Sequence, residues 1–166
     1  MADPARFEIL KDDLQSFVGT SGPLLFAVTR RPPTIASLEF FRDAMRDHVA
    51  KYPERVLLLV ALRSRRPRLS QGARSMIVEL WSEFGSRSVV GVWVGGQSFA
   101  KSLQRSFITA LSLIRVRKTP FKVVADASDA VDWFVELEPS YATVRDDWLK
   151  AVQAVIDGDS PPGADV

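Results

Sequence analysis

The distribution of apolar positions predicts short strands that alternate with amphipathic helices. Apolar runs of strand length occupy residues 24–29, 56–62, 89–94 and 121–125. The run at 56–62 contains no polar residue, which is typical of a strand covered on both faces. A weaker pattern over residues 6–18 indicates an edge strand or a strand pair. Residues 19–23 (Gly-Thr-Ser-Gly-Pro) have the composition of a turn.

Between these runs, apolar residues recur at helical spacing. Thr34 is placed to cap a first helix, and Ser70 to cap a second helix that ends at Gly85. Ser98 caps a third predicted helix, and Ser128 caps a short fourth one. This alternation predicts an α/β fold in which helices flank a mixed, mostly parallel sheet of four to six strands.

The C-terminal part of the chain is predicted to be an addition to that domain. We expect an α/β domain over residues 1–136, an appended amphipathic helix over 137–156 and a disordered tail over 157–166. Trp148 and Val152 lie on the apolar side of the appended helix, and such a stripe needs a surface to cover. The helix is therefore expected to dock on the body of the protein or on a second chain. Docked near a basic surface, it would also screen that surface.

The composition removes several classes of chemistry. The chain has no cysteine and a single histidine, His48, so it has no disulfide, no thiol nucleophile and no multi-histidine metal site. We expect no cofactor and no enzymatic activity, and we interpret His48 as a structural residue beside an apolar helix stripe. The N-terminus lacks the pattern of a signal peptide, and the longest dense apolar run is far shorter than a membrane span. These features favour a cytoplasmic location.

Charge is divided unevenly along the chain. The net charge is +2, but residues 1–125 hold 20 Lys and Arg against 10 Asp and Glu, whereas residues 126–166 hold 2 against 10. The pattern indicates a basic body with an acidic C-terminal part. Two loops after predicted strands concentrate arginine: Arg30, Arg31, Arg63, Arg65, Arg66 and Arg68.

Because carboxyl ends of parallel strands meet at one edge of a sheet, both arginine loops are expected at that edge. Gly95, Gly96 and Ser98 follow a third such strand. One interpretation is a site for an anion or an acidic partner, helped by helix N-termini; the other is a solvated basic surface. The two glycines fit a tight strand-to-helix turn better than a phosphate loop, because neither known glycine fingerprint is present.

The strand-turn-helix ending over residues 121–134, with Ala-Val-Asp-Trp-Phe at 130–134, follows alternating helices and strands and a weak N-terminal strand pair. This arrangement resembles the SpoIIAA-like branch of the STAS superfamily. The resemblance implies a regulatory module without catalysis that binds proteins or small anions. It also implies a phosphorylation site at Ser70, where anti-sigma-factor antagonists carry a serine. The arginine-rich loop before Ser70 departs from the small, acidic loop of those proteins, and capping of the second helix is the alternative role.

The sequence thus predicts a non-catalytic regulatory or protein-interaction module of the STAS/SpoIIAA-like type, with an unidentified protein partner. The alternative is an anion-binding module for nucleic acid or anionic lipid that uses the arginine loops. A homodimer is a further arrangement that the sequence allows, and an enzyme is ranked last.

Overall fold

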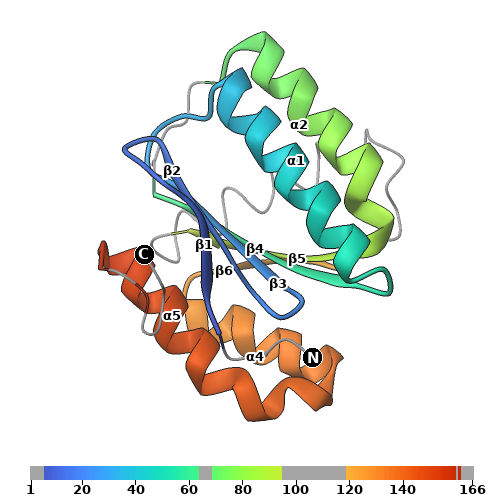
Figure 1. Cartoon of the computed structure of the whole chain (residues 1–166), viewed down its shortest axis with the longest axis vertical. Helices are drawn as coiled ribbons and strands as arrows, with labels where there is room; N and C mark the ends of the chain where they lie inside the picture. The colour runs from blue at the N-terminus through green and yellow to red at the C-terminus, as the bar shows by residue number, and fades with distance from the viewer. Residues whose placement is uncertain (1–5, 64–68, 95–118, 160, 162–166) are drawn as a thin grey trace.

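A six-stranded mixed sheet runs through the middle of the protein, with its strands in sequence order (Figure 1). The computed structural model describes residues 6–63, 69–94, 119–159 and 161. The first three strands pair antiparallel, and the pairs from β3 to β6 are parallel. The strands are β1 (Glu8–Asp12), β2 (Ser16–Ser21), β3 (Leu24–Thr29), β4 (Val56–Leu62), β5 (Ser88–Val94) and β6 (Phe121–Val124). The α/β class and the mixed sheet are therefore as predicted.

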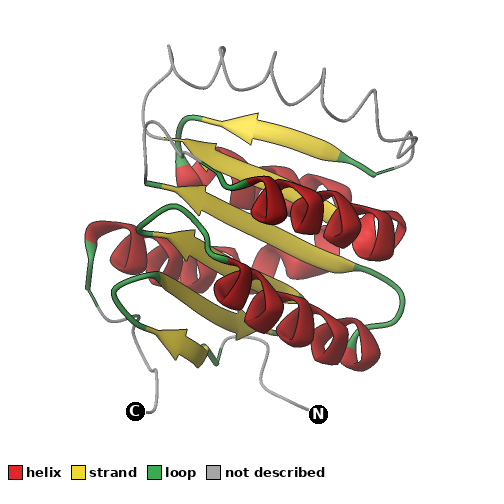
Figure 2. Ribbon diagram, turned by 90° about the horizontal axis from the view of Figure 1, so that it is seen from above, coloured by secondary structure: helices red, strands yellow, loops and turns green. Residues whose placement is uncertain are grey.

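Helices cover both faces of this sheet (Figures 1 and 2). Right-handed crossovers between consecutive parallel strands place α1 (Ile35–Lys51) and α2 (Gln71–Phe84) on the same face. The opposite face carries α4 (Ala127–Leu137) and α5 (Arg145–Asp157). Two short 3-10 helices, η1 (Gly85–Arg87) and η2 (Pro139–Val144), connect α2 to β5 and α4 to α5. The third predicted helix, which Ser98 would cap, lies outside the described residues.

The central strand is β4, as its uninterrupted apolar run predicted. It pairs with β3 on one side and β5 on the other, and Leu59 lies between Phe26 and Gly91. Side chains of successive residues point to opposite faces of a sheet. Leu59 belongs to the apolar cluster under α4 and α5, whereas Leu58 belongs to the cluster under α1 and α2. An apolar residue at every position is what a strand buried on both sides requires.

The second strand is longer than the sequence predicted. Gly19 to Ser21, which we assigned to a turn, continue β2, and the reversal itself is made by Gly22 at φ 53° and Pro23. Gly19 is needed because a Cβ atom there would lie 2.5 Å from Cε1 of the Phe7 ring. A glycine that reads locally as a turn residue is thus a close-approach position inside a strand.

Three of the predicted helix ends are confirmed and one needs correction. Thr34 caps α1 by accepting a hydrogen bond from the Ser37 amide at 3.2 Å, and Ser70 caps α2. Gly85 ends α2 but stays right-handed, at φ −58°, because the chain continues into η1. Ser128 is not a cap: Asp126 occupies that position, with no side-chain hydrogen bond to the helix.

The predicted helix over 137–156 is divided in the structure. Leu137 still belongs to α4, Pro139 begins η2, and α5 starts at Arg145. Proline has no amide hydrogen to continue a helix, and it restricts the residue before it to extended backbone. Trp148 of α5 is fully buried, and its Nε1 donates to the Ser21 hydroxyl at 3.1 Å. The segment therefore docks on its own sheet.

Candidate functional site

The carboxyl ends of β3 and β4 bring the two arginine loops together. Thr29 lies opposite Leu62 in the parallel register, and the Arg63 amide donates to the Thr29 carbonyl at 3.2 Å. Arg30, Arg31 and Arg63 therefore occupy one edge of the sheet, as the strand order predicted; we call these three residues the arginine edge. The other candidates fall outside the described residues: Arg65, Arg66, Arg68, Gly95, Gly96 and Ser98.

The three arginines of this edge differ in their partners. The Arg30 guanidinium lies 2.5 Å from the Asp12 carboxylate and also donates to the Asp13 carbonyl. Arg31 and Arg63 are exposed, and within the described part of the chain neither pairs with a carboxylate. Arg30 thus fastens the β1–β2 turn to the end of β3, whereas Arg31 and Arg63 present their charges to solvent.

Two helix N-termini adjoin this edge, and each uses its own cap. The Thr34 and Ser70 hydroxyls accept the Ser37 and Ala73 amides, respectively. The next amide of each helix donates to the backbone carbonyl of the same cap residue. The donors that would hold a phosphate are thus partly satisfied by the chain itself. Ser70 is exposed, so its role as a phosphorylation site stays a prediction beside its role as a cap.

Replacing Ser70 by alanine is expected to lower the free energy of unfolding by about 0.5–2 kcal/mol. The loss arises because the Ala73 amide, now 3.1 Å from the hydroxyl, would lose this hydrogen bond. Urea denaturation measures the effect, with Ser75→Ala, at an exposed position inside α2, as the matched control. Equal stability of the two variants would contradict the capping role.

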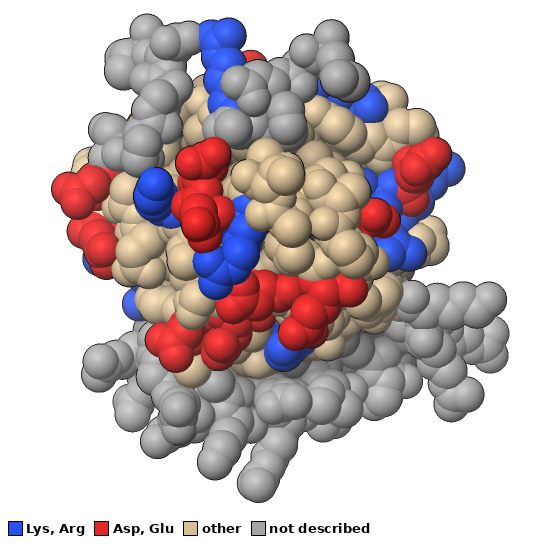
Figure 3. Space-filling model, turned by 90° about the horizontal axis from the view of Figure 1, so that it is seen from below, with Lys and Arg blue, Asp and Glu red and all other residues tan. Residues whose placement is uncertain are grey.

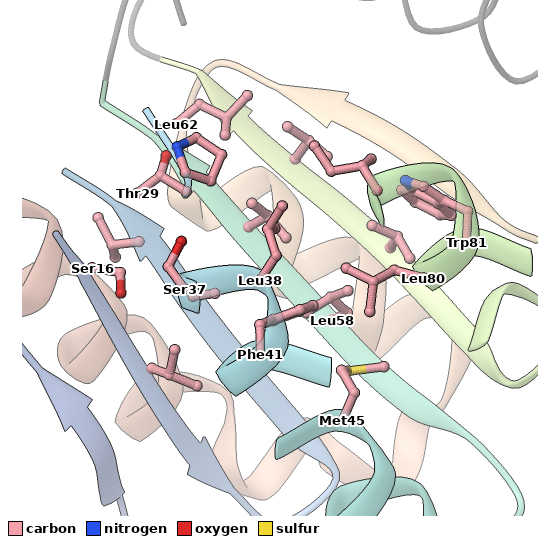
Figure 4. A pocket seen from close by; sticks show the side chains of 18 of the residues that line it. Ser16, Thr29, Ser37, Leu38, Phe41, Met45, Leu58, Leu62, Leu80 and Trp81 are labelled. Atoms are coloured by element: carbon pink, nitrogen blue, oxygen red, sulfur yellow. The ribbon is translucent and has the colours of Figure 1, made fainter. Parts of the chain in front are cut away.

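A pocket of about 300 Å³ lies between the α1–α2 layer and the sheet (Figure 4). Helix α1 contributes Leu38, Phe41 and Met45 to its walls, and α2 contributes Leu80 and Trp81. The sheet side of the pocket comes from β2 to β5. The volume is at the lower end of the range for small-molecule sites, about 300–1,000 Å³, and the walls are predominantly apolar, as in most such sites.

The pocket exists because the two faces of the central strand are covered differently. On the α4–α5 face, Leu57, Leu59 and Ala61 of β4 are fully buried. On the other face, Val60 and Leu62 remain half-buried and line the pocket. The α1–α2 layer therefore does not close over the middle and carboxyl end of β4.

Ion pairs join α1 and α2. Arg42 lies 2.7 Å from Glu79, and Arg46 lies 2.7 Å from Glu83. Within α1, Arg46 also lies 3.6 Å from Asp43. The arginines cross to α2 because its carboxylates lie within reach once the two helices pack side by side.

Three hydroxyls of the pocket lining already have hydrogen-bond partners. The hydroxyls of Thr29, Ser37 and Ser88 donate to backbone carbonyls at 3.3, 2.9 and 2.9 Å. The described lining residues include no carboxylate, imidazole or amine, and Arg31 is the one charged member among them. A polar group buried without a hydrogen bond is costly, so this interior suits an apolar guest.

The single histidine lies outside this pocket lining. His48 is buried in α1, with its ring 4.9 Å from the Tyr52 ring, and its Nε2 has no hydrogen-bond partner among the described residues. Burial lowers the pKa of His48 below 6.5, against the opposing effect of a hydrogen bond to the Pro23 backbone, and the charge of Lys51 lowers it further. The neutral ring is a packing element of α1.

Acidification below pH 6.5 is expected to destabilise the protein through His48. Below pH 6.5 the unfolded chain binds a proton at His48, whereas the buried imidazole of the folded chain stays neutral. The free energy of unfolding therefore decreases as the pH is lowered, by at most about 1.4 kcal/mol per pH unit. Above pH 7.5 both states are neutral and the contribution vanishes. Urea denaturation of the wild type and His48→Gln from pH 7.5 to 5.5 measures it. If the free energy of unfolding of His48→Gln depends on pH as steeply as that of the wild type, other groups cause the effect.

The acidic C-terminal part forms a layer on the face opposite α1 and α2. Figure 3 shows Asp and Glu side chains gathered on the side that carries α4 and α5. Within this layer Arg145 lies 2.5 Å from Asp132 and 2.6 Å from Asp146. The hydrogen bond from Arg145 lowers the pKa of the Asp132 carboxyl. Helices α4 and α5 are thus acidic, whereas acidic and basic side chains nearly balance on α1 and α2.

The sequence did not reveal the pocket. Phe41 and Trp81 occupy positions of helical apolar spacing, which is typical of core residues, but both are half-buried on the pocket wall. The sequence pattern of an apolar helix stripe is the same whether the helix packs closely on the sheet or leaves a space between them. Composition gives no signal either, because α1 and α2 carry four Phe and Trp residues and α4 and α5 carry three.

The described residues contain no group of three or more His, Cys, Asp or Glu that could hold a metal ion. None of the helices in the described ranges combines the length and the apolar character needed to cross a membrane. No protein-family model, curated protein or solved structure matches this chain.

Proposed function

We propose that this chain is a non-catalytic regulatory module that binds a small apolar ligand between the α1–α2 layer and the sheet. The observation that carries the proposal is the pocket of about 300 Å³, whose described lining has its Thr29, Ser37 and Ser88 hydroxyls engaged and no acid–base side chain. Binding of apolar surface needs shape and burial, whereas catalysis needs reactive groups placed against the substrate.

The same pocket gives the module a way to signal occupancy. A ligand there would touch Phe41 of α1 and Trp81 of α2, so it would bear on the packing of the two helices. Arg42 and Arg46 join these helices through exposed ion pairs, each of which contributes about 0–1 kcal/mol. A protein partner that contacts α1 and α2 would sense a change in their spacing. This is the protein-interaction role that the sequence favoured.

The fold proposed for the module is of the STAS/SpoIIAA-like type. Support comes from the antiparallel strand pair that leads into the parallel strands, and from the ending of β6 and α4. Within α4, Ala130, Val131 and Phe134 are buried against the sheet. These apolar positions match the pattern on which the resemblance rests.

A neutral apolar probe, decan-1-ol, tests the proposal. We expect saturable binding by calorimetry, a change in Trp81 fluorescence that Trp81→Phe removes, and stabilisation of about 2.7 kcal/mol at a probe concentration 100 times Kd. Val60→Phe should fill the pocket and abolish binding, whereas Val78→Phe, at an exposed position on α2, should not. If Val60→Phe does not fold, Ile77→Phe replaces it. Absence of saturable binding to the wild type would overturn the proposal.

Anion binding is the second candidate. The location of Arg31 and Arg63 at the same edge of the sheet favours it. Contacts to phosphates release counterions, so affinity for a duplex oligonucleotide should fall steeply with salt, with a log–log slope of about 0.9 for each phosphate contacted. Binding measured at 50 and 200 mM salt, with Arg63→Gln against Arg87→Gln, tests this candidate. Affinity that does not change with salt or with Arg63 would exclude it.

A further inference from the structure

We infer that the ligand of the pocket is a straight-chain monocarboxylate of about ten carbons, whose carboxylate pairs with Arg31. The inference rests on the proposed function, because it names the chemistry of the guest that the pocket would hold. It follows from three properties of the described lining: one charged residue at one end, an interior without available polar groups, and a volume of about 300 Å³.

The polar side chains of the lining gather largely at the carboxyl end of β3. Ser16 lies opposite Thr29 in the register of β2 and β3, and the Arg31 amide donates to the Gln15 carbonyl at 3.3 Å. Ser37 follows in the first turn of α1. Arg31 therefore belongs to the end of the pocket at the arginine edge, while Trp81 belongs to the wall that α2 forms. A guest with one charged end and one apolar body matches this polarity.

The state of Arg31 favours an anionic head group. Its neighbour Arg30 is paired with Asp12, but within the described ranges Arg31 has no carboxylate partner. Arginine presents a planar fork of N–H donors that matches a carboxylate with two parallel hydrogen bonds. A phosphate would call on more donors, and the Ser37 and Leu38 amides nearby are already bonded to Thr34.

The interior favours a plain alkyl chain. The Thr29 and Ser37 hydroxyls donate to carbonyls, so a hydroxyl or amide on the body of the guest would find few partners among the described lining residues. For comparison, an engineered apolar cavity of about 150 Å³ binds benzene, which has six carbons. A volume of about 300 Å³ therefore accommodates a chain of about ten carbons.

Chain length and head group can be varied separately in the experiment. Sodium salts of straight-chain acids with six to fourteen carbons are titrated by calorimetry at pH 8, below the concentrations at which they form micelles. Each added methylene should improve the affinity roughly fourfold until the pocket is full near ten carbons, and longer acids should gain nothing. Affinity that continues to rise through fourteen carbons would contradict a pocket of this volume and overturn the inference.

Substitutions at Arg31 test the head group. Arg31→Gln should weaken decanoate binding by about tenfold and leave decan-1-ol unchanged, while Arg31→Lys should restore part of the loss. Arg87→Gln, an exposed arginine at the opposite edge of the sheet, is the matched control and should change neither probe. Equal affinity of the wild type for decanoate and decan-1-ol would also overturn the inference.

The two probes separate the inference from the function on which it rests. If decan-1-ol binds and Val60→Phe blocks it, but decanoate shows no dependence on Arg31, the monocarboxylate is wrong and the apolar site stands. If neither probe binds the wild type, the proposed function fails and the inference fails with it. If decanoate alone binds and Val60→Phe has no effect, the carboxylate is held at the surface, which contradicts both.

Discussion

Replacing Trp148 by alanine is expected to remove about 3–5 kcal/mol from a folding free energy of about 5–15 kcal/mol. The side chain is fully buried in the cluster beneath α4 and α5, and its Nε1 donates to the Ser21 hydroxyl at 3.1 Å. Alanine would leave a large cavity and remove the hydrogen bond between α5 and β2. Urea denaturation followed by circular dichroism measures the loss.

Trp148→Phe is the matched control, because it keeps an aromatic ring in the cluster and loses only the indole N–H and the smaller part of the ring volume. It should cost much less than Trp148→Ala. Removal of residues 137–166 should leave a chain that aggregates or unfolds, since α5 covers apolar sheet surface. A loss below about 1 kcal/mol for Trp148→Ala, or a folded truncated chain, would show that α5 is dispensable.

Replacing Leu59 by alanine is expected to cost about 2–5 kcal/mol. Leu59 lies in the central strand between Phe26 and Gly91 and is fully buried. Aromatic and aliphatic side chains surround it in the cluster under α4 and α5, so the space left by three carbons and their hydrogens cannot be closed by small movements. The change should appear as a lower urea midpoint with an unchanged dependence on urea concentration.

The same substitution at an exposed position provides the control. Leu14 is 77% exposed, in the turn between β1 and β2, and Leu14→Ala should change the stability by less than about 0.5 kcal/mol. Comparable losses at the two positions would contradict the central placement of β4.

The pocket lowers the stability of the protein, whereas the burial of Trp148 and Leu59 raises it. Half-buried Val60 and Leu62 lose contacts that a closed face would give them, so the α1–α2 side is held less tightly than the α4–α5 side. A surface kept open at a cost in packing is a reasonable place for a ligand, because a bound guest supplies the missing contacts. Proteins carry such departures from best packing at functional sites.

Local features of the fold were available from the sequence. The run at 56–62 predicts a strand covered on both sides, because a polar residue on either face would be buried without a partner. Thr34 and Ser70 predict helix starts, because a hydroxyl there satisfies amides within the next turn. The strand order predicts that Arg31 and Arg63 share an edge. Each of these conclusions depends on neighbours in sequence or on the handedness of crossovers.

Other features depend on residues that are distant in sequence. Gly19 lies in β2 against the Phe7 ring, which leaves no room for a Cβ atom. Arg42 pairs with Glu79 because α1 and α2 lie side by side. Residues 137–144 leave the helical pattern at Pro139, and Trp148 is buried because the sheet receives it. Local periodicity records which face of an element is apolar, not which surface meets that face.

The sequence by itself therefore determined the α/β class, the central strand, two helix caps and the shared arginine edge. Only the tertiary structure decided that α5 seals one face of the sheet while α1 and α2 leave a pocket of about 300 Å³ on the other. The physical reason is that an apolar stripe fixes the direction in which a helix is buried, whereas the space beneath it depends on how the facing side chains fit together.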